Sequence, residues 1–171
     1  MICARGVAGL DYSHAVYAGS FDPITLGHTA IIERAARVYR RVTVAVGVNV
    51  AKSGLFSLEE RRELIERTLT HPNIDVTSFE GLLVDFARAL GAGVLLRGLR
   101  MLTDFEHEFQ LALGNRDLVP EMETVFMMTD HEYVYVSSSL VKEIASNGGD
   151  TSRYVPPAVQ DALRKKLGAQ G

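Results

Sequence analysis

The sequence predicts an α/β fold, with one five-stranded parallel sheet and helices on both of its faces. Short β-branched runs alternate along the chain with longer segments of helical periodicity, which is the pattern of repeated strand–helix–strand units. Capping and turn residues separate the segments. Ligands of such sheets bind at the carboxyl ends of the strands, so the loops that follow the strands are the candidate site.

Five apolar runs are the predicted strands. The run 42–48 is rich in valine, which is typical of a strand that is covered on both faces. The predicted strands span residues 14–18, 42–48, 74–79, 94–96 and 124–128.

Six helical segments follow from periodicity and capping residues. Ser57 and Glu60 form a capping box, and Thr103 and Glu106 predict a second one, ahead of an apolar side that includes Phe105 and Phe109. Gly91 ends the third helix, and Pro156-Pro157 opens the last one. The predicted helices cover 28–39, 58–69, 82–90, a segment from about 103 to 113, 140–146 and 157–167.

Length, charge and composition limit the class of protein. The 171 residues suit one domain, which we place at 14–171, after a flexible extension at 1–13. The net charge of −3 argues against a nucleic-acid partner. The single cysteine excludes an intrachain disulfide and a cysteine metal cluster. No apolar run approaches the roughly 18 residues that span a bilayer, so we expect a cytoplasmic protein with no membrane partner.

The loop after the first strand, Gly19–His28, carries the most specific signal. Ser20 offers a hydroxyl and a backbone N–H to an anion, and Gly27 allows a close approach to the backbone. His28 falls in the first turn of a helix, where free N–H groups and the helix dipole favour a phosphate. The alternative for a lone Gly-His pair is a strand-to-helix turn with a capping role.

Three later segments are also placed to bind phosphates. Lys52 follows the second strand, and Arg97-Gly98-Leu99-Arg100 follows the fourth. Ser137-Ser138-Ser139 precedes a helix, where ordinary capping needs only one serine. No group of residues forms a dedicated metal cage, so we expect any Mg²⁺ to be held mainly by the phosphates of a bound ligand.

These motifs together resemble one enzyme family. Thr25-Leu26-Gly27-His28 is similar to the [His/Thr]-x-Gly-His signature of the nucleotidylyltransferase superfamily. Gly19–Pro23 narrows the resemblance to the phosphopantetheine adenylyltransferases, and it extends from about residue 16 to 167. The resemblance implies the nucleotidylyltransferase fold, a Rossmann-like parallel sheet. The superfamily usually has an arginine where this chain has Lys142, whose role the resemblance leaves open.

The resemblance also implies which residues form the site. It makes His28 the stabiliser of the transition state, with Lys52 and Arg97 as further catalytic residues. It places the acceptor substrate at Ser20, Lys52, Leu83 and Arg97, although Leu83 also fits a plain core leucine. It places ATP at Ser20, Phe21, His28, Gly98, Leu99, Arg100, Glu108, Tyr133, Val134, Tyr135, Val136, Ser137, Ser138 and Ser139.

The implied reaction is reversible adenylyl transfer from ATP to 4′-phosphopantetheine, which gives dephospho-coenzyme A and pyrophosphate. Mg²⁺ is the implied cofactor, and a homohexamer with feedback inhibition by coenzyme A is implied as well. The alternatives are another adenylyl- or cytidylyltransferase of the superfamily and a nucleotide-binding module without turnover. A dinucleotide-dependent dehydrogenase is disfavoured because no G-x-G-x-x-G follows the first strand.

Overall fold

The computed structural model describes residues 9–48 and 54–168, apart from the side chains of residues 102 and 103. Within these ranges, five parallel strands form a single sheet in the order β3-β2-β1-β4-β5. The predicted five-stranded parallel sheet is therefore confirmed. Its strands are β1 (Asp11–Gly19), β2 (Arg41–Gly47), β3 (Ile74–Phe79), β4 (Ala92–Leu99) and β5 (Glu123–Met128).

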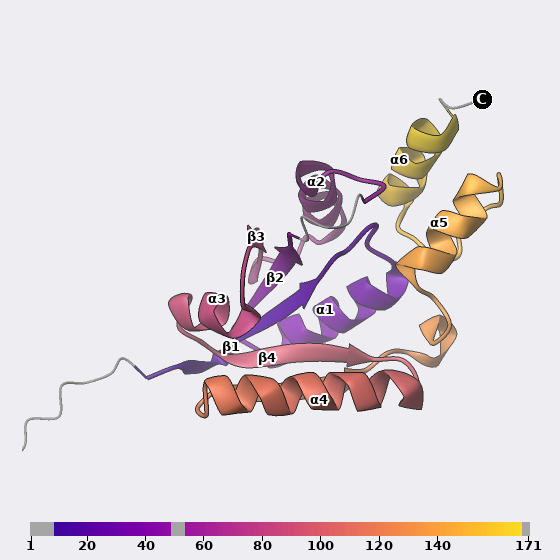
Figure 1. Ribbon diagram of the computed structural model, residues 1–171. Coiled ribbons are helices and arrows are strands. Elements are labelled where there is room, and N and C mark those ends of the chain that lie inside the picture. The colour runs from indigo at the N-terminus through magenta and orange to yellow at the C-terminus, as the bar shows by residue number, and fades with distance from the viewer. Residues whose placement is uncertain (1–8, 49–53, 169–171) are drawn as a thin grey trace, which may run out of the picture.

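Helices join and follow the strands (Figure 1). In the described part of the chain they are α1 (Leu26–Val38), α2 (Leu58–Thr68), α3 (Leu83–Ala89), α4 (Leu102–Leu118), the short 3₁₀ helix η1 (His131–Tyr133), α5 (Ser138–Ser146) and α6 (Pro157–Gly168). None of them is both long and apolar enough to cross a bilayer.

Alternate residues of β1 divide between two apolar cores. Ala15 and Tyr17 face the larger core, which α1, α2, α5 and α6 cover. Val16 and Ala18 face the smaller core, which is covered by α3 and by the segment after α4. Helices therefore lie on both faces of the sheet. This agrees with the β-branched composition of the central strands, which are buried on both faces.

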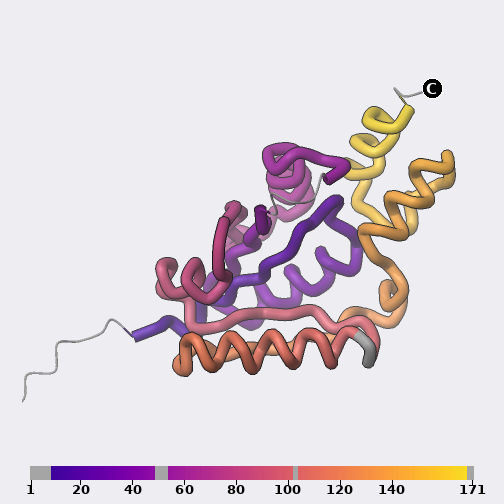
Figure 2. The backbone as a smooth tube through the Cα atoms, in the orientation of Figure 1, coloured from indigo at the N-terminus to yellow at the C-terminus, as the bar shows by residue number. Residues whose placement is uncertain are grey.

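The central position of β1 creates the ligand crevice. The chain runs from β1 outward to β2 and β3, and then crosses back to β4 on the other side of β1. The loops that leave β1 and β4 therefore diverge at the carboxyl edge of the sheet, which is where open α/β sheets bind ligands. The tube in Figure 2 shows α5 and α6 beyond this edge, away from the strands' amino ends.

The boundaries that differ from the sequence predictions include those of β4, β1 and α4. Strand β4 continues to Leu99, so Arg97, Gly98 and Leu99 lie in the strand and only Arg100 follows it. Strand β1 begins at Asp11, so Asp11–Ser13 belong to the sheet and not to an N-terminal extension. The Asp11 carboxylate accepts hydrogen bonds from the N–H and the hydroxyl of Ser13, which fixes this start. Helix α4 begins at Leu102, with Met101 in the capping position and no side-chain hydrogen bond there. The predicted capping box at Thr103 is therefore wrong, since Thr103 lies inside the helix.

Candidate active site

A cavity of about 400 Å³ opens at the carboxyl ends of β1 and β4. The loop after β1, the start of α1, the end of β4, one side of α4 and the start of α5 all contribute to its wall. The predicted site residues that line it are Ser20, Phe21, His28, Arg97, Gly98, Arg100, Glu108, Val136, Ser137, Ser138 and Ser139. Segments more than 100 residues apart in the chain therefore meet at the predicted edge of the sheet.

His28 is fixed by the residue that caps its helix. The Thr25 hydroxyl accepts the backbone N–H of His28, and the backbone N–H of Thr25 donates to Nδ1 of His28 at 3.1 Å. This is a capping box in which histidine takes the place of the usual glutamate. The Phe21 ring packs edge-on against the imidazole, with 5.2 Å between ring centroids. The imidazole is thereby held in one orientation at the helix N-terminus.

The protonation state of His28 follows from the same contacts. Burial, with a smaller contribution from the charge of Arg100, lowers the pKa of His28 to about 4. The imidazole is therefore neutral at physiological pH. Because Nδ1 accepts a backbone N–H, the proton of the neutral ring sits on Nε2. His28 thus offers the cavity one fixed N–H donor.

Arg97 and Glu108 form a two-pronged ion pair across the cavity wall. Nε and Nη2 of Arg97 donate to the two carboxylate oxygens of Glu108, at 2.5 and 2.7 Å. Nη1 also donates to the carbonyl of Ala18 at 3.2 Å. A guanidinium has five N–H donors, so two remain for a ligand. The family resemblance implies that Arg97 contacts the acceptor and Glu108 contacts ATP, and the structure pairs the two residues directly.

Arg100 links the end of β4 to α4 and to the segment before α5. Its Nε and Nη2 donate to the carboxylate of Asp104, and Nη1 donates to the carbonyl of Val136 at 3.1 Å. The carboxylate of Asp104 therefore orients this arginine. Both arginines of the motif are thus ordered by acids of α4 before a ligand binds.

The three serines before α5 have different partners. Ser137 is the N-cap, and its hydroxyl accepts the N–H of Leu140 at 3.1 Å. The Ser138 hydroxyl donates to the carbonyl of Pro23 at 2.8 Å. Ser139 lines the cavity and is exposed. Capping therefore accounts for one serine, and a second serine ties the start of α5 to the loop after β1.

The two glycines of the motifs have packing partners. A Cβ at Gly27 would lie 3.2 Å from Cβ of Tyr133, and one at Gly98 would lie 2.5 Å from Cδ1 of Ile31. Glycine at these positions therefore lets α1 approach η1 and β4 closely. The sequence interpretation explained Gly27 by the close approach of a ligand to the backbone, and not by packing between elements.

Some predicted residues do not line the cavity. Lys52 lies outside the described residues. Leu83 begins α3 and packs against the smaller core, where its predicted contact with the acceptor stays untested. Leu99 is buried at the end of β4, while Tyr133, Val134 and Tyr135 form η1 and the turn after it. Tyr135 is exposed, with its ring edge-on to that of Tyr154.

Sequence reasoning missed three polar residues at this end of the sheet. Asp22 is buried in the loop after β1 and binds partners from three other segments. Thr129 lines the cavity, is 7% exposed, and its Oγ1 has no partner in the described part of the chain. His107 also lines the cavity. Asp22 lies inside the recognised motif Gly19–Pro23, whereas nothing in the local sequence marks Thr129.

Solved structures share this fold at low sequence identity. A bifunctional NMN adenylyltransferase/ADP-ribose pyrophosphatase from Francisella tularensis aligns with a TM-score of 0.70 and 16% identity, over 94% of this chain and 51% of that chain. The nicotinic acid mononucleotide adenylyltransferase of Plasmodium falciparum aligns with a TM-score of 0.64 and 14% identity, over 90% and 94% of the two chains. These structures confirm the predicted fold class.

Sequence relatives are much closer. The phosphopantetheine adenylyltransferase of Heliobacterium modesticaldum is 55% identical over 155 residues, which cover 90% of this chain and 92% of that protein. The enzyme of the same name from Rhodopirellula baltica is 48% identical over 165 residues, or 94% and 92% of the two chains. The cytidylyltransferase-like family model matches residues 16–144. The chain therefore belongs to the phosphopantetheine adenylyltransferase family.

Proposed function

We propose that the protein transfers the adenylyl group of ATP to 4′-phosphopantetheine, giving dephospho-coenzyme A and pyrophosphate, in a reversible reaction. The observation that carries the proposal is the His28 imidazole, which is neutral, fixed through Nδ1 and left with an Nε2–H donor in the cavity. A fixed donor at a helix N-terminus suits an oxygen whose negative charge grows during transfer. The close relatives carry this activity in their names.

The proposed chemistry requires no general base. A phosphate oxygen of the acceptor attacks the α-phosphorus of ATP, and the bond from that phosphorus to the bridging oxygen breaks in line. The electron pair leaves with pyrophosphate. Because the attacking phosphate is already ionised at neutral pH, the protein contributes positioning and charge stabilisation.

Each wall of the cavity has a part in this proposal. His28 stabilises the α-phosphate, while Ser20, Lys52 and Arg97 orient the acceptor phosphate. Gly98 and Arg100, with Ser138 and Ser139 at the start of α5, take the distal phosphates of ATP. The two N-termini of α1 and α5 converge on one cavity, and both favour anions.

We propose that Mg²⁺ enters with ATP, whose phosphate charge it would neutralise. The two acids in the cavity wall, Asp104 and Glu108, are already paired with Arg100 and Arg97. Over residues 9–48 and 54–168, no group of three or more His, Cys, Asp or Glu residues is arranged to hold a metal. The protein groups therefore suit an ion that the phosphates hold.

Exposed apolar side chains support the proposed assembly into a homohexamer. Phe105, Phe109, Leu113 and Leu118 of α4 are between 40% and 57% exposed. An apolar surface of this kind favours association with another protein surface. Light scattering after gel filtration measures the assembly, and a monomer at micromolar concentration would contradict it. Feedback inhibition by coenzyme A and a cytoplasmic location complete the proposal.

A pyrophosphate-release assay with ATP and a panel of acceptors tests the proposed function. We expect release with 4′-phosphopantetheine and little or none with nicotinate mononucleotide or small phospho-alcohols. Release with one of these other acceptors instead would indicate another transferase of the superfamily. ATP binding without release for any acceptor would indicate a binding module.

A further inference from the structure

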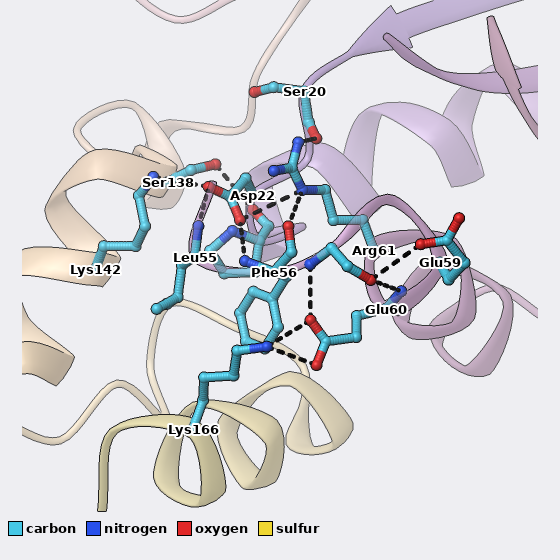
Figure 3. A network of polar contacts seen from close by, with 12 residues as sticks. Ser20, Asp22, Leu55, Phe56, Glu59, Glu60, Arg61, Ser138, Lys142 and Lys166 are labelled. Carbon is cyan, nitrogen blue, oxygen red and sulfur yellow. Dashed lines mark hydrogen bonds and ion pairs between the residues drawn. The ribbon is translucent and has the colours of Figure 1, made fainter. Parts of the chain in front are cut away.

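Asp22 is the centre of a polar network beside the cavity (Figure 3). Its carboxylate accepts the backbone N–H groups of Leu55 and Phe56 at 3.0 and 2.9 Å. The ammonium of Lys142 donates to the same carboxylate at 2.9 Å, and Nε of Arg61 lies 3.4 Å from it. Four groups from three segments thus converge on one side chain.

The carboxylate remains charged although it is buried. Asp22 is 5% exposed. Burial alone would raise the pKa of Asp22, but the N–H of Phe56, the ammonium of Lys142, the N–H of Leu55 and the charge of Arg61 together outweigh it and lower the pKa. A buried carboxylate is tolerated only where such partners satisfy its oxygens.

The partners of Asp22 belong to elements that approach the cavity. Lys142 lies on α5, one turn after the serines that line the cavity wall. Arg61 lies on α2 and donates from Nη1 to the carbonyl of Ser20 at 3.4 Å. Asp22 itself follows Ser20 by two residues, and Ser138 holds the carbonyl of the next residue, Pro23. The hydrogen bonds from Arg61 and Ser138 therefore fix the loop after β1, and the ion pair with Lys142 fixes α5.

Asp22 does not line the cavity, so it acts on the ligand only through these neighbours. Figure 3 shows the network on the side of the loop where α2 and α5 face each other. The α2 side is held further by α6, because Lys166 donates to both oxygens of Glu60 and lies over the Phe56 ring. The network of polar contacts therefore extends to α6.

We propose that Asp22 is a positioning residue for the reaction, which sets the distance between the loop after β1 and the N-terminus of α5 through its ion pair with Lys142. This inference rests on the proposed function. In the proposed reaction the loop after β1 holds the attacking phosphate and the N-terminus of α5 holds the leaving pyrophosphate. A shift of about 1 Å between these segments would cost on the order of 100-fold in rate. The ion pair joins residues 120 positions apart in the sequence, and the Ser138–Pro23 hydrogen bond is a second contact between the same two segments.

A double-mutant cycle tests the pair. Asp22→Asn keeps the shape of the side chain but removes its charge, and Lys142→Met removes the ammonium and keeps the stem. We expect each variant to lower kcat on the order of 10- to 100-fold, while the Kd for ATP from calorimetry rises less than about fivefold. We expect the double variant to be no slower than the slower single variant, because both changes break one contact.

Asp75→Asn is the matched control. Asp75 pairs with Arg41 at 2.6 Å at the amino ends of β2 and β3, at the opposite edge of the sheet, and its loss should leave kcat unchanged. The folded fraction of every variant is measured by circular dichroism under the assay conditions. A loss of kcat that only follows the folded fraction would mean that Asp22 is merely structural and would overturn the inference.

Two further results would also overturn it. One is a folded Asp22→Asn variant whose kcat and KM both lie within about twofold of the parent. The other is a multiplicative loss in the double variant, which would mean that Lys142 acts independently of Asp22. If Asp22→Asn does not fold, unchanged kcat in Lys142→Met overturns the inference, and a loss on the expected scale supports it. The unsubstituted chain in the same assay tests the proposed function separately.

Discussion

At the residue scale, the chemistry depends on single atoms whose hydrogen-bonding roles are fixed. His28 is the clearest case, because its Nδ1 is occupied by a backbone N–H and its ring is neutral. The same residue caps a helix and presents a donor to the cavity. One side chain therefore couples the local structure of α1 to the proposed transition state.

We expect His28→Ala to lower kcat far more than it weakens ATP binding. Loss of one donor that acts on a developing charge costs on the order of 3 kcal/mol, which is about a hundredfold or more in rate. Steady-state pyrophosphate release measures kcat, and calorimetry measures the Kd for ATP. His131→Ala, which changes an exposed histidine of η1, is the control and should retain the parent rate. Near-normal kcat in His28→Ala would contradict the role.

We expect Thr129→Val to raise the Kd for ATP about fivefold, while Thr129→Ser stays close to the parent. The Thr129 hydroxyl is buried in the cavity wall without a partner in the described chain, and a net hydrogen bond to a ligand is worth about 1 kcal/mol. Thr29→Val is the control, since Thr29 is also 7% exposed but donates to the carbonyl of Leu26 and does not line the cavity. Unchanged ATP affinity with a raised Tm in Thr129→Val would show that the hydroxyl has no ligand.

At the element scale, two helix N-termini form the proposed phosphate-binding surface. Thr25 caps α1 together with His28, and Ser137 caps α5. Each cap satisfies one backbone donor and leaves others in the first turn for a ligand. The Ser138 bond to Pro23 holds the two termini at a fixed separation.

We expect the double variant Ser138→Ala, Ser139→Ala to keep its fold and to lose preference for ATP over AMP. Only ATP carries the distal phosphates that this terminus is proposed to bind. Calorimetric titration with both nucleotides gives the ratio. Ser137→Ala is the matched control, because it removes the cap and should cost about 1 kcal/mol of stability while the ATP:AMP ratio stays constant. A double variant with lowered Tm and an unchanged ratio would show that these serines serve the fold alone.

At the scale of the whole molecule, the order of strands brings the site together and buries its ionisable groups. The central position of β1 places its loop between those of β2 and β4. This arrangement places the half-buried His28 near the charge of Arg100, and it buries His14 in the sheet, where Nε2 lies 2.8 Å from the Thr43 hydroxyl. Burial first, and then the charge of Arg41, lowers the pKa of His14.

We expect the free energy of unfolding to fall as the pH falls from about 6.5 toward about 4. Both histidines have folded-state pKa values below the ordinary value, so the unfolded chain binds more protons in this range and stability rises with pH. The contribution is fully present above about pH 6.5 and is lost as the pH approaches 4. Tm measured across this range, for the parent and for His28→Asn, gives the slope. An identical slope in His28→Asn would contradict the buried, neutral state of His28.

The sequence by itself determined the strands, most helices and the loops that carry the chemistry. The five strands were recognisable because a sheet covered on both faces needs continuous β-branched runs. The capping box at Ser57 was correct because its two partners are three residues apart. His28 and Ser137 were found because each lies at the start of a helix, and Arg97 because it lies near the carboxyl end of a strand.

The tertiary structure alone decided which side chains meet. Arg97 pairs with Glu108, Asp22 with Lys142, and Ser138 with Pro23, over separations of 11, 120 and 115 residues. Periodicity and capping act over three or four residues and carry no information about such pairs. The exposure of Phe105 and Phe109 on α4 was equally hidden, because a helical apolar pattern does not say what covers it. These contacts follow from strand order, which is set by how the whole chain buries its apolar surface.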